Sequence, residues 1–414
     1  MPITPAVPLT YSWYARLPDL LGLQHPITED EPGTQIAITE EETHFIRNHQ
    51  AAELQLQGIL AELLRSRDCL CGAPIEVAGG RVHHVPEMGV AAGVRALQRA
   101  AHGIDVLTNH VRVLEQLRPV DFLDFRDALQ PASGAESFQF RMMEAILGGA
   151  PPCGLAALGV LGRKARVAAD AAGPGTERER VEGATADRIG AFREDLERRG
   201  TLRSWVLHWL YRTPLGGQQP WEAGAKSAAE RFSTSWVDAW WGWRRTHPRA
   251  VESERDQLMG FLQGIDVSGD KQLLAAHQDA MTHLPPDDLD RVEDPVAWWA
   301  RIRLALAFIE TYDDLPLLAL PRVLVDALVQ LEANIKFWRD RHARLAERLI
   351  GNRPGTGGSA GVAHLDATRG ITFFPEFIAV RTVLMPRRHR PEVDATAYLY
   401  AREVDPMDLM RRTA

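Results

Sequence analysis

Along most of the chain, apolar residues recur at intervals of three or four positions, whereas runs in which apolar and polar residues alternate are scarce. An interval of three to four gathers apolar side chains on one face of an α-helix, and alternation would mark a strand. The pattern therefore predicts an all-α fold.

The first long helix is predicted to begin near Glu40. Thr39 and Glu42 have the spacing of a capping box, in which paired side chains satisfy amide groups of the first turn. Downstream, one histidine interrupts an otherwise apolar stripe, which consists of Phe45, His49, Ala52, Leu56, Ile59 and Leu63. We therefore expect His49 to face the interior.

Further helices are predicted over residues 88–117 and after Pro119, since proline suits the first turn of a helix. Beyond them lies the corner QPASGAESFQFR. Ser133 and Glu136 have capping-box spacing there, which predicts that another helix starts at this corner.

One arginine lies on the apolar side of the helix after the proline. Phe122, Arg126 and Leu129 share that side. A guanidinium inside a helix bundle must be paired, because it cannot give up its proton. Asp124 lies two residues before Arg126 and Asp127 one residue after it, and residues at these spacings do not face each other on a helix. We expect the partner to be an anion, such as the carboxylate of a ligand.

The last long helix is predicted to run from Pro321 to a C-cap at Gly351. Its stripe again contains one histidine and consists of Leu324, Leu328, Leu331, Ile335, Trp338, His342, Leu345 and Leu349. The next segment, NRPGTGGSAGVAHL, lacks the spacing of a dinucleotide fingerprint and the Gly-Lys-Ser/Thr of a phosphate loop. It is either a lid that brings the Thr356 hydroxyl to a small ligand or a plain linker.

The middle of the chain has features that favour structure over chemistry. Residues 163–200 are highly charged and interrupted by Gly-Pro-Gly, which indicates a solvated helical excursion. Trp236, Trp240 and Trp243 share a helical face, which favours a core or subunit interface over a ligand box. Residues 283–295 are predicted to form a loop.

Charge and cysteine content exclude several classes of function. The net charge is −8 with no long block of Lys and Arg, which argues against a nucleic-acid partner. The apolar runs are too short for a membrane span, and no secretory signal opens the chain, so we expect a cytoplasmic protein. Cys69, Cys71 and Cys153 are too few for a disulfide framework, and CLCG, followed by His83 and His84, lacks the second pair of a zinc site. We interpret CLCG as a loop with free thiols.

Each inward histidine, taken alone, is more often a hydrogen-bonded core residue than a ligand. An inward His49, an inward Arg126, a second histidine on a separate helix and a glycine-rich loop together indicate a cofactor site held in a helix bundle. The residues alone leave that cofactor unnamed.

Four motifs, in order, resemble segments of the tryptophan 2,3-dioxygenase family of haem enzymes. LTYSWYARLPDLLGLQHPI resembles its N-terminal entry, ETHFIRNHQAAEL its distal-histidine segment, and LDFRDALQPASGAESFQFR its arginine helix and corner. WRDRHARLAERLIGNRPGTGGSAGVAHL, followed by TFFPEFIAVRT, resembles its proximal-histidine helix, glycine-rich loop and tail. The resemblance covers about residues 9–149 and 299–382. It implies one all-α domain over residues 1–414 that holds a b-type haem, with a divergent helical middle segment at about 150–298.

The resemblance also assigns roles to individual residues. It implies that His342 is the axial ligand of the haem iron and that His49 lies on the distal side, near the substrate indole nitrogen. Arg126 would bind the substrate α-carboxylate, and Thr356 its ammonium or carboxylate, as the loop closes. Ser133 would lie near the haem edge.

The remaining implied contacts surround the indole. Phe45, Phe122 and Leu129 would wall it, while Tyr11 and Tyr14 would reach in from a neighbouring subunit of a homotetramer. The implied reaction uses ferrous haem and dioxygen to open the indole ring of tryptophan, giving N-formylkynurenine. Whether His49 acts as a base stays open.

The chain also departs from the family pattern. The family's usual Glu-Leu-Trp-Phe-Lys is ELQLQ here, Ala135 and Glu136 replace Phe and Gln, and Val111 replaces a bulky aromatic residue. Smaller side chains leave room for a substituted tryptophan as the substrate. Two other functions stay open: a haem enzyme of specialised metabolism that inserts one oxygen atom or rearranges an aromatic amino acid, and a non-catalytic sensor of haem or tryptophan.

Overall fold

The computed structural model describes residues 9–30, 36–77, 80–149, 154–251, 253–262 and 295–399. Regular structure in these ranges is helical except for one antiparallel hairpin of β1 (Ala73–Val77) and β2 (Gly80–His84), in which Ala73 pairs with His84. The predicted all-α fold is confirmed. Cys153 and, apart from Pro295, the predicted loop at 283–295 lie outside the described residues.

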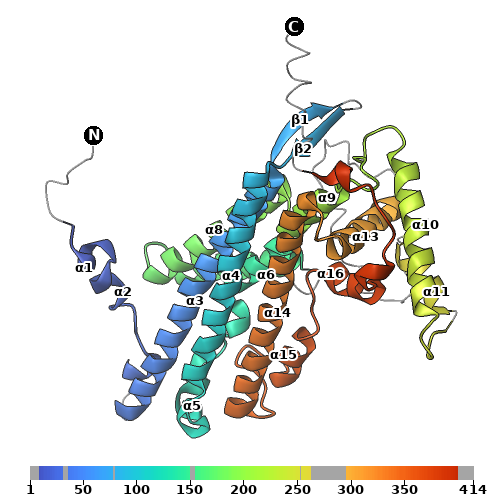
Figure 1. Ribbon diagram of the computed structural model, residues 1–414. Helices are drawn as coiled ribbons and strands as arrows, with labels where there is room; N and C mark the ends of the chain where they lie inside the picture. The colour runs from blue at the N-terminus through green and yellow to red at the C-terminus, as the bar shows by residue number, and fades with distance from the viewer. Residues whose placement is uncertain are drawn as a thin grey trace. The chain divides into compact units, whose positions relative to one another are not determined.

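The α-helices follow one another along the chain as Figure 1 shows. They are α1 (Tyr11–Tyr14), α2 (Leu17–Leu20), α3 (Ile36–Cys71), α4 (Glu87–Leu114), α5 (Pro119–Arg126), α6 (Phe138–Ile146), α7 (Leu155–Ala172), α8 (Glu177–Arg199), α9 (Leu202–Tyr211), α10 (Ala225–Arg244), α11 (Ser253–Leu262), α13 (Pro295–Thr311), α14 (Pro316–Ile350), α15 (Val362–Thr368) and α16 (Pro375–Ala379). Short 3-10 helices are η1 (Ile27–Asp30), η2 (Asp127–Leu129), η3 (Gly134–Glu136), η4 (Val380–Val383), η5 (Arg387–His389) and η6 (Ala395–Tyr398).

The chain divides into two compact units. Unit 1 comprises the described parts of residues 1–56, 105–137 and 337–370, and unit 2 comprises the described parts of the rest. Three of the five boundaries fall inside α3, α4 and α14, so each of these helices contributes residues to both units. Every residue that the sequence nominates for the site belongs to unit 1.

Unit 1 is held together by an apolar core. The core consists of Val111, Leu114, Leu117, Phe122, Phe125, Leu345 and Leu349, against which Ile38, Phe45, Leu129, Trp338 and Ile350 pack. These residues come from α3, α4, α5, η2 and α14, except for Leu117, which lies in the turn between α4 and α5. Burying such side chains stabilises the unit by about 1.5–3 kcal/mol each. The core therefore fixes the ends of three helices on which candidate site residues lie.

The start of α3 differs from the prediction. The helix begins at Ile36, four residues before Glu40, so Thr39 lies inside it and forms no capping box. Instead, the Glu42 carboxylate accepts hydrogen bonds from the backbone amides of Ile27 and Thr28, at 2.8 and 2.9 Å, and from the Thr28 hydroxyl at 2.6 Å. Amides from a preceding segment satisfy this carboxylate, which a local spacing rule cannot foresee.

Two other helix starts also differ. Ser133 caps the single turn η3 by accepting a hydrogen bond from the amide of Ala135 at 3.3 Å, and α6 begins only at Phe138. The last long helix begins at Pro316 and includes Pro321 in its interior. Its predicted end is confirmed: α14 stops at Ile350, and Gly351 takes a positive φ of 55°, which favours glycine.

Unit 2 contains the middle of the chain. The charged stretch at 163–200 forms α7 and α8, which pack against each other after a turn at residues 173–176. On α10, Trp236 and Trp240 are buried, at 0% and 6% exposure, so they are core residues as predicted. Among the described residues, no helix is long and apolar enough to cross a membrane.

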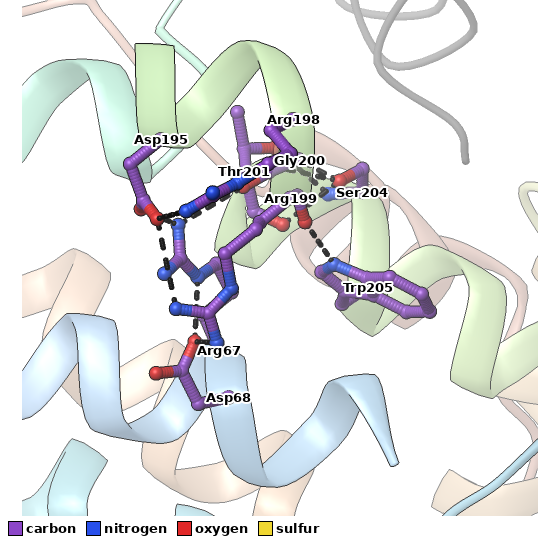
Figure 2. A network of polar contacts seen from close by, with 9 residues as sticks. All are labelled: Arg67, Asp68, Asp195, Arg198, Arg199, Gly200, Thr201, Ser204 and Trp205. Carbon is purple, nitrogen blue, oxygen red and sulfur yellow. Dashed lines mark hydrogen bonds and ion pairs between the residues drawn. The ribbon is translucent and has the colours of Figure 1, made fainter. Parts of the chain in front are cut away.

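Charged networks tie the helices of unit 2 together. Figure 2 shows Arg67 of α3, which is 2% exposed, contacting Asp195 of α8 at 2.5 Å and Asp68 at 2.9 Å. Arg199 contacts Asp68 at 2.6 Å, and its carbonyl accepts from the indole N–H of Trp205 on α9, also at 2.6 Å. Because each buried charge has a partner, the network avoids most of the cost of burying an unpaired ion.

A second charged contact in unit 2 joins α9 to α16. Arg203 donates to the Glu376 carboxylate, and both side chains are fully buried. Nearby, the Glu332 carboxylate of α14 accepts from the amides of Phe373 and Phe374 at 2.8 and 3.0 Å. These contacts fasten the segment that follows the glycine-rich loop to the helices of unit 2.

Candidate active site

Unit 1 contains all ten residues that the sequence nominates. They come from α1 (Tyr11 and Tyr14), α3 (Phe45 and His49), α5 (Phe122 and Arg126), η2 (Leu129), the corner before η3 (Ser133), α14 (His342) and the glycine-rich loop (Thr356).

His49 differs from the prediction in one respect and agrees in another. The residue is exposed rather than buried in the stripe. Protein nevertheless surrounds the ring closely enough that burial lowers the pKa of His49, so the imidazole is neutral at pH 7. Its Nδ1 lies 2.8 Å from the Phe45 carbonyl oxygen, which can only accept. Nδ1 therefore holds the proton and Nε2 is free to accept one.

His342 is half-buried on α14. Burial, together with the nearby His49, lowers the pKa of His342 to about 4. The two imidazoles are thus close enough to interact electrostatically. Among the described residues, neither ring nitrogen of His342 has a hydrogen-bond partner. A neutral imidazole with an uncommitted nitrogen has the state that a metal ligand requires.

Arg126 is buried, at 7% exposure. One of its Nη groups pairs with the exposed carboxylate of Asp127 at 3.2 Å, and the other donates to the Pro354 carbonyl. The sequence argument that Asp127 does not face Arg126 is wrong, because α5 ends at Arg126 and Asp127 begins the tighter 3-10 turn of η2. The Nε–H of Arg126 is buried and has no hydrogen-bond partner in the part of the chain that the structure describes. A buried guanidinium with an unpaired N–H is suited to a further anion.

The glycine-rich loop docks on the corner that follows Arg126. The Thr356 hydroxyl donates to the Ala132 carbonyl at 2.6 Å. Gly357 packs so closely that a Cβ there would lie 2.7 Å from the Cβ of Ser133. Together with the contact between Arg126 and Pro354, these approaches place the loop over the helix that positions the guanidinium.

The aromatic residues of the site form a cluster. The ring of Phe45 lies 4.0 Å from that of His49, 5.5 Å from Phe122 and 5.6 Å from Phe125, measured between centroids. Leu129 packs against the same core. The cluster gives His49 an apolar flank, which accounts for the burial that lowers its pKa.

The two tyrosines stand apart from this cluster. Tyr11 and Tyr14 lie on the four-residue helix α1 and are 76% and 75% exposed, and Trp13 between them is 69% exposed. Their rings form no aromatic contact within the described chain. The structure therefore leaves them accessible to another molecule.

Three contacts of the site were missed by the sequence reasoning. Phe125 is 1% exposed and packs against Phe45 and Phe122, but it was not among the residues expected to surround the indole. The Pro354 backbone carbonyl accepts a hydrogen bond from Arg126, and a backbone acceptor leaves no side-chain pattern in the sequence. Trp338 stacks on His342, and the spacing of four residues on one helix was a signal that could have revealed it.

The comparisons with known proteins identify the family of the chain. A family model described as tryptophan 2,3-dioxygenase matches residues 5–151 and 293–384. The chain belongs to the tryptophan 2,3-dioxygenase family. Tryptophan 2,3-dioxygenase 2 of Ralstonia nicotianae is 32% identical over 411 residues, which cover 96% of this chain and 99% of that protein. Tryptophan 2,3-dioxygenase of Sorangium cellulosum is 32% identical over 93% of this chain and 86% of its own length.

A shorter relative matches less of the chain. A tryptophan 2,3-dioxygenase-like protein of Xanthomonas campestris pv. campestris is 30% identical over 67% of this chain and 95% of its own length. The family model leaves residues 152–292 unmatched, yet the Ralstonia and Sorangium proteins align across almost the whole chain. The middle segment is therefore shared with some relatives. Membership makes the chain an oxidoreductase of the dioxygenase class, in a family that depends on haem.

Proposed function

We propose that the chain binds a b-type haem through His342 and, with dioxygen, opens the indole ring of L-tryptophan or a substituted tryptophan to give N-formylkynurenine. The observation that supports this most directly is the coexistence in unit 1 of a neutral, uncommitted imidazole at His342 and a buried guanidinium with an unpaired N–H at Arg126. The first suits a metal ligand and the second suits a substrate carboxylate.

The donor set of unit 1 fits a haem better than a bare metal ion. No group of three or more His, Cys, Asp or Glu side chains in the described part of the chain is placed to hold a metal ion. A porphyrin brings four nitrogen ligands of its own, so a single protein imidazole completes the attachment. His342 would hold the iron, and Ser133 would lie near the edge of the macrocycle. When bound, the haem supplies the activation of dioxygen.

The residues of the chain supply binding and orientation. Arg126 would exchange the neutral Pro354 carbonyl for the substrate carboxylate and would satisfy its free Nε–H at the same time. Since Thr356 and Pro354 belong to one loop, this exchange would couple substrate binding to a movement of the loop. The Thr356 hydroxyl, released from Ala132, would contact the ammonium or carboxylate of the substrate.

His49 would orient the indole. Its Nε2 can accept the indole N–H, because Nδ1 is committed to the Phe45 carbonyl and the ring is neutral. Phe45, Phe122 and Leu129 would wall the ring and exclude water from it. This apolar flank keeps the imidazole in the accepting form at neutral pH.

The residue at position 111 bears on the choice between plain and substituted tryptophan. Val111 is buried in the core beside Phe122 and Phe125, where the family pattern has a bulkier side chain. A smaller residue behind the wall leaves room for a substituent, and each additional buried methylene gains about 0.8 kcal/mol. Competition between L-tryptophan and ring-methylated analogues tests this, and a higher kcat/KM for plain tryptophan than for every analogue would exclude the wider substrate.

The proposed assembly is a homotetramer in which Tyr11 and Tyr14 reach the site of a neighbouring subunit. The exposure of α1 supports this, because three large aromatic side chains on four residues are costly to leave in water. Light scattering of the wild type and a Tyr11→Ser, Trp13→Ser, Tyr14→Ser variant tests the proposal. A wild-type monomer would contradict it.

Reconstitution with haem tests the axial ligand. We expect wild-type protein to bind one haem per chain with a histidine-type Soret band, and His342→Ala to lose it. His102→Ala is the matched control, since His102 is an exposed helical histidine with its Nδ1 on a backbone carbonyl. Equal haem binding by His342→Ala and wild type would refute the assignment.

A further inference from the structure

Trp338 and His342 form a flat stack on α14. Their ring centroids lie 5.2 Å apart and their planes differ by only 6°. The two residues are one helical turn apart, so the helix itself brings the rings together. Trp338 in turn packs against the apolar core of unit 1. The core thus holds the indole of Trp338 in place, and the imidazole of His342 lies parallel to it.

Histidines that ligate metals almost always donate their second ring N–H to a carboxylate, a carbonyl or a water, which sets the orientation of the ring. His342 has no such partner among the described residues. The contrast with His49 is direct, because His49 donates to the carbonyl one turn before it on α3.

The acids near His342 are committed to other partners. Asp340 pairs with Arg369. Glu115 pairs with Arg341 at 2.8 Å, and Glu347 with Arg344 at 2.5 Å. None of these three carboxylates forms a hydrogen bond with His342.

We propose that Trp338 is a positioning residue that sets the plane of the His342 imidazole by stacking. This rests on the proposed haem ligation by His342. Rotation of the imidazole about its Cβ–Cγ bond would lift it off the indole, and the core prevents the indole from following.

The proposal predicts how removal of the Trp338 indole affects bound haem. In Trp338→Leu the imidazole would sample several orientations, so the iron–histidine stretching band of the ferrous protein would shift and broaden. Loss of haem to an excess of apomyoglobin would accelerate about two- to tenfold, the range expected for one aromatic pair. Trp338→Phe retains a flat ring and would restore most of the wild-type rate and band.

Trp243 provides a matched control. It also stacks on a histidine, His389, at 6.4 Å and 29°, but in unit 2. Trp243→Leu should leave haem loss and the stretching band unchanged. If Trp338→Leu does not fold, Trp338→Met replaces it, because methionine fills the space without a flat face.

The outcomes separate the two proposals. Failure of wild-type protein to bind haem would refute the haem assignment, and this inference with it. Haem binding with wild-type loss rates and an unchanged band in Trp338→Leu would overturn the positioning role alone. Trp338→Phe and Trp338→Leu could instead show the same rise in haem loss, the same change in the stretching band and the same drop in the unfolding temperature of the haem-free protein. That result would mean that Trp338 acts only as a core residue.

Discussion

Replacing Arg126 by leucine tests how the substrate is held. The guanidinium is 7% exposed, one of its donors has no partner, and another is on the neutral carbonyl of Pro354. A bound carboxylate would satisfy the free Nε–H and would replace a neutral acceptor by a charged one. A hydrogen bond to a charged group contributes about 1.5–3 kcal/mol, and the bond that the carboxylate adds at Nε is one such bond. We expect the Kd of L-tryptophan to rise about 10- to 150-fold in Arg126→Leu.

Tryptamine keeps the indole and the amine of tryptophan but has no carboxylate. Comparing the two ligands therefore isolates the contribution of the carboxylate to the binding free energy. Calorimetric titration of the anaerobic holoenzyme should show that Arg126→Leu strongly weakens the binding of tryptophan, whereas the binding of tryptamine weakens less than about threefold. Arg118→Leu is the control, since Arg118 is 74% exposed and pairs with Asp121 on the surface. If Arg126→Leu raises the Kd of both ligands by the same factor, or if Arg118→Leu raises the Kd of tryptophan as much as Arg126→Leu does, Arg126 does not bind the carboxylate.

Three further predictions concern His49, the glycine-rich loop and the buried carboxylate of Glu376. Burial holds the pKa of His49 below 6.5, so kcat/KM should stay on its plateau at pH 7 and fall only as acid protonates the ring; a midpoint above 6.5 for this residue would contradict the neutral acceptor. Gly357→Ala would place a Cβ against Ser133 and displace the loop, so Thr356 would no longer reach the substrate and tryptophan should bind about tenfold more weakly; unchanged affinity by the same calorimetry would show that Thr356 does not contact the substrate. Glu376→Ala removes one partner of a fully buried ion pair and should lower the free energy of unfolding by about 3–5 kcal/mol in urea denaturation; a loss below about 1 kcal/mol would mean that water reaches the remaining charge.

The sequence predicted what depends on local periodicity. The two histidine-bearing helices and the arginine helix follow from spacings of three and four, and the end of α14 follows from Gly351. The roles of His49 and His342 came from the family resemblance instead. They stay predictions, although the lowered pKa values of both residues are consistent with them.

The failures share a physical cause, because each concerns a partner that is distant in sequence or a change of helix type. Glu42 is satisfied by amides of residues 27 and 28, which precede the helix, so the local capping box was wrong. The contact between Arg126 and Pro354 joins residues 228 positions apart through a backbone carbonyl. Asp127 reaches Arg126 only because the α-helix gives way to a 3-10 turn. Spacing rules for a regular helix contain none of this information.

The measurement that tests the central claim most directly is an anaerobic absorption spectrum of the ferrous, haem-loaded protein with L-tryptophan, followed by admission of air and mass analysis of the product. The account predicts a histidine-type Soret band that shifts with tryptophan, and a product heavier than the substrate by two oxygen atoms. A gain of one oxygen atom would move the function to the alternative haem chemistry, and tight binding without oxygen consumption would indicate a sensor. Absence of haem uptake would contradict the account as a whole.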